Sequence, residues 1–385
     1  MKKICVLIGS RANYSSIKNV LYELKKNKKT KLLIIAFSSA LLDKFGKVSE
    51  IIKKDGFKID EEIYNHLDGE TPLTMSKSTG LAIIELSSIL SKHKPDIVLT
   101  IGDRYETIAT AISSTYLNIP LAHTMGGEVS GTIDESIRHA ITKFSHIHFP
   151  ASKDAFNRII KLGENKKNVF MVGCPRIDEV KKILNKKVSI NQIEKSLFTT
   201  GVGNKFHLKQ KFLLLSQHPV TTEFSLSDKH IENTLLAIKK INLPTIGLWP
   251  NPDAGSAEMA KVIRKFREVG FSNNIYFFKN LDLNTYINLM NLTSCLIGNS
   301  SSAIREGAFI GTPSVNIGSR QSGRERASNV IDADNNTLNI SKAIAKQLVR
   351  KKYKSSNIYG DGNSAKKITK ILSNIKVNIQ KRITY

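Results

Sequence analysis

The chain has 385 residues, of which 41% are hydrophobic and 24% are charged; such a composition supports a buried core and excludes a disordered protein. Lys and Arg number 58 against 33 Asp and Glu, which gives a formal net charge of +25. This surplus is spread along the whole chain without the interleaved aromatic residues of an RNA-binding surface, so we expect no nucleic-acid partner. No apolar stretch reaches the ~18 residues of a membrane helix, and the start of the chain does not read as a signal peptide, so we expect no membrane partner.

Three cysteines, Cys5, Cys174 and Cys295, stand far apart, each in an apolar run. They are too few for a disulfide scaffold, and none lies in the C-x-x-C pattern of metal or redox sites. This usage indicates a reduced, cytoplasmic protein, and we expect neither a metal nor another cofactor.

Short apolar runs alternate with helical patterns in the first half of the chain. The runs are continuous, as is typical of parallel strands that are covered on both faces. The predicted strands are 3–9, 32–37, 96–101, 119–123, 145–149 and 168–172, and the predicted helices are 14–28, 74–92, 104–117, 133–144 and 152–162. This β-α repetition predicts a doubly wound α/β domain.

The same rhythm restarts after a polar, Lys-rich stretch. The second set of predicted strands is 211–216, 245–249, 274–278, 294–298 and 313–317, with helices near 226–240, 256–269, 283–291, 302–309, 338–352 and 363–378. We predict an N-terminal lobe over 1–184, a junction over 185–210, a C-terminal lobe over 211–362 and a closing helix over 363–385. Two facing Rossmann-like lobes would place the active site in the cleft between them, at the carboxyl ends of the strands.

The segment after the first predicted strand, from Gly9 to Ser15, favours a tight turn into a helix N-terminus, which is an anion-binding feature. Arg11 would add a planar guanidinium for phosphate. The alternative is a plain turn with a surface arginine. Neither G-x-G-x-x-G nor the P-loop pattern occurs in the chain, which disfavours a dinucleotide site with that fingerprint and a P-loop.

An acid and a base follow another of the predicted strands. Asp103 could be a base and Arg104 a phosphate ligand, or Asp103 could cap the helix that follows. The next loop carries Glu128 and Asp134, and crowding of carboxylates favours acid/base work because like charges raise carboxylate pKa values. Asp134 could equally be a helix N-cap, and the spacing of His123 with these acids is no zinc motif.

The strand ends of the second lobe are also polar. The serines at 300–302 open a predicted helix, and their hydroxyl groups together with helix N–H groups could cradle a diphosphate. Glu306 could accept hydrogen bonds from two ribose hydroxyls, and Arg320 adds positive charge to the same rim. The alternative is a serine-rich N-cap.

Seven strings in chain order make the sequence similar to the hydrolysing UDP-N-acetylglucosamine 2-epimerase family of sialic-acid-type sugar biosynthesis. They are GSRANYS, GDRYE, HTMGGEVSGTIDESIRHAITK, HPVTTE, PNPDAGS, GNSSSAIREG and GSRQSGR, and they span roughly residues 3 to 330. The resemblance implies two facing Rossmann-like lobes of the GT-B type, with UDP held mostly by the C-terminal lobe. The residues that would contact UDP are Arg11, Ser15, Arg104, His218, Asn251, Ser300, Ser301, Glu306 and Arg320.

In the reaction that the resemblance implies, a base removes the C2 proton of UDP-N-acetylglucosamine while UDP leaves C1, which gives a 2-acetamidoglucal. Water then adds, and the products are UDP and the free 2-epimer, N-acetylmannosamine. Asp103 and Asp134 would be acid/base carboxylates, with Glu128 beside them. The departing diphosphate requires positive charge and N–H donors. We also expect a homo-oligomer, either a dimer or a tetramer.

Two positions depart from the pattern of the family. The family usually has Glu where this chain has Met125, and that Glu is one of its expected acid/base carboxylates; the acid of its GTRADY string is Asn13 here, which removes charge near the sugar. Either Glu128 compensates for Met125, or the substrate is a less polar UDP-linked 2,4-diacetamido-trideoxy sugar of the bacillosamine type, as in legionaminic-acid-type synthesis. We place N-acetylglucosamine first and the bacillosamine-type sugar second.

Two alternatives belong to other functional classes. A GT-B glycosyltransferase with a UDP-sugar donor would need the same UDP lobe, but an acceptor site in place of the carboxylate loop. A non-catalytic nucleotide-sugar sensor would bind the same ligand without turning it over.

Overall fold

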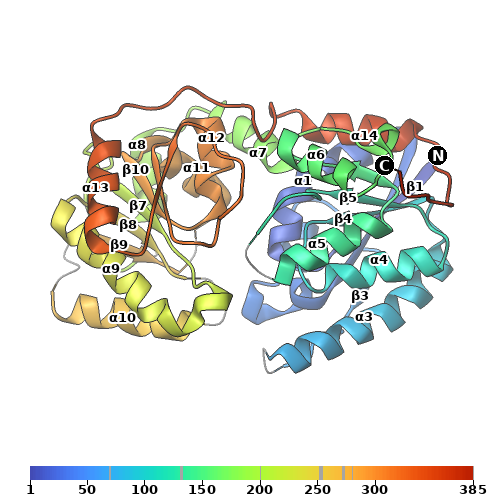
Figure 1. Ribbon diagram of the computed structural model, residues 1–385, viewed down its shortest axis with the longest axis horizontal. Coiled ribbons are helices and arrows are strands. Elements are labelled where there is room, and N and C mark those ends of the chain that lie inside the picture. The colour runs from blue at the N-terminus through green and yellow to red at the C-terminus, as the bar shows by residue number, and fades with distance from the viewer. Residues whose placement is uncertain are drawn as a thin grey trace. The chain divides into compact units, whose positions relative to one another are not determined.

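The computed structural model describes residues 1–68, 71–130, 133–199, 201–250, 255–270, 274–279 and 281–384. The chain divides into two compact units (Figure 1). Unit 1 comprises Met1–Val129, Ile133–Glu179 and Gly360–Tyr385, and unit 2 is built from Val180–Tyr359. The division falls near the predicted boundary at 184, but the predicted closing helix returns to unit 1, and the predicted junction at 185–210 lies in unit 2.

Unit 1 is built on a six-stranded sheet with the strand order β3-β2-β1-β4-β5-β6. All neighbouring strands are parallel. The strands are β1 (Lys2–Ile8), β2 (Thr30–Phe37), β3 (Glu61–Ile63), β4 (Ile97–Ile101), β5 (Leu121–Thr124) and β6 (Ile147–Phe149). This is the strand order of a doubly wound Rossmann sheet, in which the order of the strands along the sheet reverses between β1 and β4.

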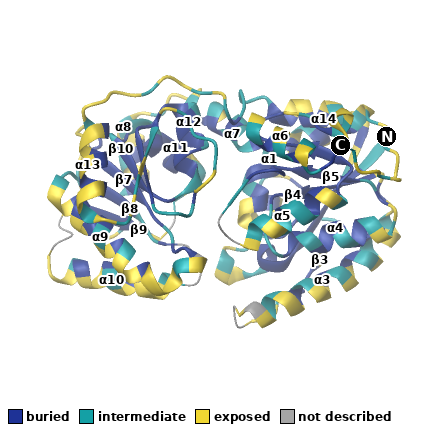
Figure 2. Ribbon diagram, in the orientation of Figure 1, coloured by how far each residue is buried: buried dark blue, intermediate teal, exposed yellow. Residues whose placement is uncertain are grey.

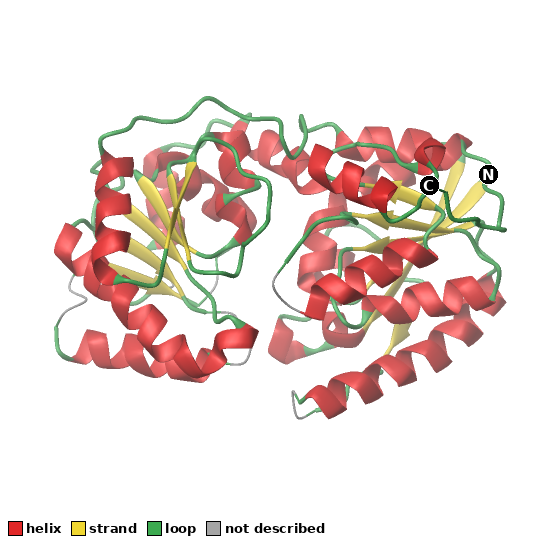
Figure 3. Ribbon diagram, in the orientation of Figure 1, coloured by secondary structure: helices red, strands yellow, loops and turns green. Residues whose placement is uncertain are grey.

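Helices cover both faces of this sheet (Figure 3). They are α1 (Arg11–Lys26), α2 (Val48–Lys54), α3 (Pro72–His93), α4 (Thr107–Tyr116), α5 (Ile133–Phe144), α6 (Lys153–Lys161) and α14 (Ser364–Asn374), while α7 (Pro175–Leu184) leads into unit 2. Cys5 and Leu7 pack in one core with α3, α4 and α5. Ile4, Val6 and Ile8 point to the opposite face because strand side chains alternate, and they are buried as well. Burial on both faces explains the continuous apolar run of β1 (Figure 2).

Unit 2 repeats the same topology with the strand order β12-β11-β10-β7-β8-β9. Its strands are β7 (Leu213–Ser216), β8 (Thr245–Leu248), β9 (Ile275–Phe278), β10 (Cys295–Gly298), β11 (Ser314–Ile317) and β12 (Val330–Ala333). The helices α9 (Ser227–Ile241), α10 (Ser256–Glu268) and α13 (Thr337–Leu348) share one core, and α8 (Ile190–Leu197), α11 (Leu283–Leu292) and α12 (Glu306–Ile310) lie with the other. In unit 2 the order of the strands along the sheet reverses between β7 and β10.

The predicted α/β class with two Rossmann-like lobes is confirmed, and the errors lie in short elements. Segment 168–172 is not a strand: it forms a single bridge between Val169 and His148. The edge strands β3 and β12 have only three and four residues and carry Glu61, Glu62 and Asp332, so they show no apolar run. The predicted junction contains α8, whose Ile193 and Leu197 are buried in unit 2.

Some classes of site are missing from the part of the chain that the structure describes. None of its helices is both long enough and apolar enough to cross a membrane. Over the same residues, no group of three or more His, Cys, Asp or Glu side chains is arranged to hold a metal ion. All three cysteines are buried, and none of them forms a disulfide.

The segment after α14 is held on unit 1 by a buried carboxylate. Glu164, only 3% exposed, accepts hydrogen bonds from Lys143 Nζ at 2.7 Å and pairs with Lys381 Nζ at 2.8 Å and His148 Nε2 at 3.1 Å. Burial acts to raise the pKa of Glu164, but the hydrogen bonds from His148, Lys143 and Lys381 outweigh it and lower this pKa to about 2. Lys381 thus pins the C-terminal segment to β6 and α5.

Replacing Lys381 with Met should lower the melting temperature of unit 1 by several degrees. The change removes one of the two lysine partners of the buried Glu164 carboxylate, which costs about 1–3 kcal/mol. Calorimetry of the variant measures the shift. Lys376→Met, which removes an exposed lysine of the same segment, is the control; equal melting temperatures for the two variants would show that the Glu164 pair does not anchor the segment.

Candidate functional site

Each unit has a topological switch point, where the connections that follow two neighbouring parallel strands leave toward opposite edges of the sheet. In unit 1 this switch point lies between β1 and β4, and in unit 2 it lies between β7 and β10. Open α/β sheets bind ligands at the carboxyl ends of the strands at such points. The predicted site residues divide between these two rims, and each rim is described on its own.

A buried asparagine ties the two strand ends together in unit 1. The Asn13 side-chain oxygen accepts from the Gly9 N–H at 3.1 Å, and its side-chain nitrogen donates to the Ile101 carbonyl at 3.1 Å. Asn13 is only 3% exposed. An aspartate has no N–H to donate to Ile101. Asn13 therefore braces the two strand ends, and the effect of its missing charge on a sugar stays a prediction.

The guanidinium of Arg138 gathers two of the predicted catalytic residues. Arg138 is 1% exposed, and one terminal nitrogen bonds the carboxylate of Asp103 while the other donates to the Glu128 carbonyl at 2.8 Å. Asp103 follows β4, and Glu128, itself 5% exposed, follows β5. Arg138 therefore fixes the Asp103 carboxylate against the backbone of the next loop, and its charge balances that of Asp103.

Helix α5 brings a third carboxylate to this rim. Asp134 lies in its first turn, and Arg138 lies four residues later on the same helix face. The negative charge of Asp134 also acts on Arg104, which follows Asp103 in the chain. Unit 1 therefore brings Asp103, Arg104, Glu128 and Asp134 to one rim. Arg138 was not singled out from the sequence, although the Asp134–Arg138 spacing of four was a signal for it.

The loop between β5 and Glu128 packs against the protein itself. His123 Nε2 lies 2.8 Å from the Gly102 carbonyl, so this nitrogen carries the proton. A Cβ on Gly126 would lie 2.7 Å from His123 Nδ1, and one on Gly127, with φ of +75°, would collide with the Ala155 carbonyl. The backbone at these two glycines therefore lies close to His123 and to α6.

Arg11 and Ser15 lie on the first turns of α1 in the same unit. Ser10 is the N-cap and accepts from the Asn13 N–H at 3.3 Å. Arg11 is exposed, and the Ser15 hydroxyl donates to the Ala12 carbonyl at 3.1 Å. Arg11 is the residue of this turn whose charge faces solvent.

A second asparagine braces the switch point of unit 2. The Asn299 side chain accepts from the His218 N–H at 2.8 Å and donates to the His218 carbonyl at 2.7 Å. The Asn299 carbonyl in turn accepts from Arg320 Nη1 at 3.2 Å and from Gln321 Nε2 at 2.9 Å. Three loops, after β7, β10 and β11, thus meet at Asn299, which brings the predicted residues His218 and Arg320 together. Asn299 and Gln321 were not among the predicted site residues.

The serine segment differs from its prediction. The expected helix at 302–309 is a 3₁₀ turn, Ser301–Ala303, followed by the five-residue α12. Ser300 Oγ accepts from the Ser302 N–H at 3.4 Å and lies 2.9 Å from Ser302 Oγ, and such local bonds compete with a continuous helix. Ser300 and Ser301 are half-buried beside Asn299, while Glu306, the first residue of α12, is 2% exposed. A helix dipole therefore adds little to this rim.

The charge of the unit 2 rim comes from arginine rather than from histidine. Burial, with a smaller effect from Arg320, lowers the pKa of His218 to about 3, so this ring is neutral at pH 7. Arg320 remains the positive group beside it. The predicted UDP ligand Asn251 lies outside the described residues.

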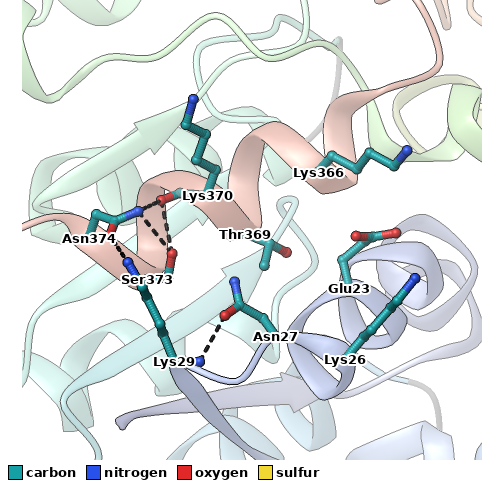
Figure 4. A pocket seen from close by; sticks show the side chains of 9 residues that line it. All are labelled: Glu23, Lys26, Asn27, Lys29, Lys366, Thr369, Lys370, Ser373 and Asn374. Atoms are coloured by element: carbon teal, nitrogen blue, oxygen red, sulfur yellow. Dashed lines mark hydrogen bonds between the residues drawn. The ribbon is translucent and has the colours of Figure 1, made fainter.

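One pocket, of about 380 Å³, lies away from both rims (Figure 4). It is lined by the end of α1, the turn before β2 and α14, with the residues Glu23, Lys26, Asn27, Lys29, Lys366, Thr369, Lys370, Ser373 and Asn374. Because α1 begins at the carboxyl end of β1 and runs back, its last turn lies at the opposite end of the sheet. Lys26 lies in this turn, and its positive charge is favourable there because it complements the dipole at the C-terminus of α1. We assign no ligand to this pocket.

Comparison with known proteins identifies the relatives of the chain. A family model described as UDP-N-acetylglucosamine 2-epimerase matches residues 22–373. The chain is 34% identical over 380 residues to UDP-N,N'-diacetylbacillosamine 2-epimerase (hydrolyzing) of Legionella pneumophila, covering 99% of this chain and 98% of that protein. It is 27% identical over 388 residues to UDP-N-acetylglucosamine 2-epimerase of Neisseria meningitidis, covering 99% and 98%.

The fold has solved counterparts. The crystal structure of UDP-GlcNAc 2-epimerase from Neisseria meningitidis bound to UDP-GlcNAc superposes with a TM-score of 0.81 at 18% identity, covering 96% of this chain and 99% of that one. At this identity the match supports the two-lobe α/β fold alone.

Burial of His123 should make the protein less stable as the pH falls. Burial lowers the pKa of His123 to about 3 from an ordinary value of 6.5. Between these values the unfolded chain binds a proton that the folded protein does not, so stability falls below pH 6.5 by up to about 1.4 kcal/mol per pH unit. Melting curves from pH 7 to 5 should show a flatter decline for His123→Asn than for wild type. His207→Asn, at a side chain 89% exposed, should keep the wild-type slope, and an unchanged slope in His123→Asn would contradict the assignment.

Proposed function

The chain belongs to the UDP-N-acetylglucosamine 2-epimerase family, and we propose that it is a hydrolysing UDP-sugar 2-epimerase whose substrate is a UDP-linked 2,4-diacetamido-trideoxy sugar of the bacillosamine type. Its products are UDP and the free 2-epimer of that sugar. N-acetylglucosamine, which the sequence analysis placed first, becomes the second candidate. Two observations reverse the order: the relation to the Legionella protein and the surroundings of Met125.

The identities give the first support. Over nearly the same full length, the chain is 34% identical to a protein named for diacetylbacillosamine and 27% identical to one named for N-acetylglucosamine. The name of the former also states the hydrolysing reaction. This difference favours the bacillosamine-type substrate.

Met125 carries the proposal. It is 8% exposed, has φ of +60°, and its N–H donates to the Phe149 carbonyl at 3.0 Å. A left-handed backbone at a residue other than glycine is costly and is often found at functional sites. The thioether lies 3.8 Å from Cys174 Sγ, and its methyl group lies 3.7 Å from where a Cβ on Gly102 would stand. An apolar, adaptable side chain thus lies next to the residue that precedes Asp103.

An apolar side chain at position 125 suits the bacillosamine-type sugar. That sugar has a methyl group at C6 and an acetamido group at C4, where N-acetylglucosamine has hydroxyl groups. A methionine contributes packing to such groups and contributes no hydrogen bond to a hydroxyl. A pocket that lacks a polar partner discriminates against a more polar substrate because a hydroxyl buried there loses its bonds to water.

The chemistry then divides between the rims. On unit 1, Asp103, Glu128 and Asp134 are the candidate acid/base groups: one removes the C2 proton as UDP leaves C1, and the water that adds to C1 loses a proton while C2 gains one. Arg11 and Arg104 offer positive charge to the departing diphosphate. On unit 2, His218, Ser300, Ser301, Glu306 and Arg320 are the proposed UDP ligands, with Asn251 among them. A GT-B glycosyltransferase would need an acceptor site in place of these carboxylates.

The substrate assignment predicts opposite effects of Met125→Glu on two sugars. With the UDP-linked bacillosamine-type sugar, kcat/KM should fall about tenfold or more, because a carboxylate is desolvated beside apolar groups. With UDP-N-acetylglucosamine, the variant should hold or gain activity. Steady-state kinetics of wild type and variant on both substrates measure this. Met171→Glu, at a methionine 53% exposed in unit 1, should change neither; an equal loss on both sugars for Met125→Glu would make Met125 a core residue and contradict the proposal.

The role of Asp103 predicts a loss of rate without a loss of UDP affinity. Asp103→Asn keeps the size of the side chain and an oxygen that can accept from Arg138, but it cannot take a proton. We expect kcat to fall by about 10²-fold or more, the scale of acid/base catalysis, while UDP binding measured by calorimetry stays unchanged. Asp96→Asn, at an exposed acid of the same unit, serves as the control. An active Asp103→Asn enzyme would leave Asp103 only as a charge partner of Arg138.

A further inference from the structure

A buried carboxylate lies behind the rim of unit 1, and the reaction described above does not use it. Glu106 has an exposed fraction of 0%. Its Oε1 accepts a hydrogen bond from Arg104 Nε at 2.8 Å, and over the described residues its Oε2 has no hydrogen-bond partner. A carboxylate without exposure requires a cationic partner, because burial of an unpaired charge is costly. Arg104 is that partner.

The turn after β1 fixes the position of Glu106. A Cβ on Gly9 would lie 2.8 Å from Glu106 Cγ and 3.0 Å from the Phe37 ring. The backbone of the turn at Gly9 therefore packs directly against the Glu106 side chain. Asn13 ties this same turn to the end of β4, so the backbone that packs against Glu106 is itself held in place.

The way in which Glu106 holds Arg104 matters for a ligand. The bond uses Nε, on one edge of the guanidinium, and the Arg104 side chain is 41% exposed. Within the part of the chain that the structure describes, the two terminal nitrogens form no hydrogen bond, and they are the planar pair that matches phosphate oxygens. The negative charge of Asp134 also attracts Arg104, so an arginine without Glu106 would have a candidate acid/base carboxylate as its remaining anionic neighbour.

We propose that Glu106 is a positioning residue, which anchors Arg104 by its Nε edge so that the terminal nitrogens bind the diphosphate of the nucleotide sugar. The same anchor keeps Arg104 from pairing with Asp134. This inference rests on the proposed function, because it assumes a diphosphate ligand. It assigns to Glu106 no contact with the substrate.

Glu106→Gln tests the inference while keeping the shape of the side chain. We expect UDP affinity, measured by calorimetry, to fall about tenfold, the effect of about one charge-assisted hydrogen bond, and KM for the nucleotide sugar to rise with little change in kcat. In the Arg104→Ala background the same change should have no further effect, since its action passes through Arg104. Glu164→Gln, at a second buried carboxylate of unit 1, should leave UDP affinity unchanged.

The outcomes separate the two proposals. If wild type does not bind UDP, the proposed function fails and the inference fails with it. If wild type binds UDP and Glu106→Gln binds it equally well, or if the two substitutions are additive, the inference alone is overturned.

A second variant covers the case in which Glu106→Gln does not fold. Arg104→Lys keeps the charge, but its ammonium has one donor atom on a flexible stem in place of the separate Nε and terminal-nitrogen edges of the guanidinium. Its UDP affinity should therefore fall by about as much as that of Arg104→Ala. A lysine variant that binds UDP like wild type would contradict the positioning role.

Discussion

At a switch point, two neighbouring parallel strands send the chain in opposite directions, and the backbone groups at their ends lose the partners that a ladder would give them. A buried N–H or carbonyl without a partner costs about 1–3 kcal/mol, so the ends must be satisfied in another way. In both units an asparagine does this, because its side chain is at once a donor and an acceptor. Asn13 joins Gly9 to Ile101, and Asn299 bonds both backbone groups of His218. The arrangement of the loops that carry the candidate site residues depends on these two braces.

The second constraint is charge balance on unit 1. Asp103, Glu128 and Asp134 stand at one rim with the buried Glu106 behind them, and the two arginines there are bound in different ways. Arg138 is buried and spends both terminal nitrogens on Asp103 and on the Glu128 carbonyl, while Arg104 spends only Nε on Glu106. The buried arginine therefore orders the rim, and the partly exposed one keeps its phosphate-binding edge. The rim of unit 2 has fewer charges to balance: His218 is neutral, and Arg320 supplies the positive charge.

The sequence predicted the parts of the fold that long apolar runs specify. Strands such as β1 and β4 are buried on both faces and leave an unmistakable pattern, whereas the edge strand β3 has three residues, two of them glutamates. Side-chain bonds to the backbone also escaped prediction: those of Ser300 break the expected helix at 302–309. The backbone of Gly126 lies close to His123 of the same unit, and no local pattern reveals this contact.

The candidate site could be predicted only as far as residue types at strand ends allow. Asp103, Asp134 and Arg104 were found because they follow strands, and Asp134 and Arg138 share a helix face at a spacing of four. That Arg138 is buried, and that Glu106 lies under the turn at Gly9, are consequences of tertiary packing. A sequence pattern does not distinguish such an arginine from one on the surface, since both occupy an amphipathic helix.

The central claim is that this chain eliminates UDP from a bacillosamine-type sugar nucleotide and hydrates the resulting glycal. The most direct test is turnover of that substrate by wild type in D₂O, with the products analysed by NMR and mass spectrometry. The account predicts UDP and a free 2-epimeric sugar with one solvent deuterium at C2, because the proton at C2 is removed and then replaced from water. A product that remains linked to UDP, or a free sugar with unchanged configuration and no deuterium at C2, would contradict it.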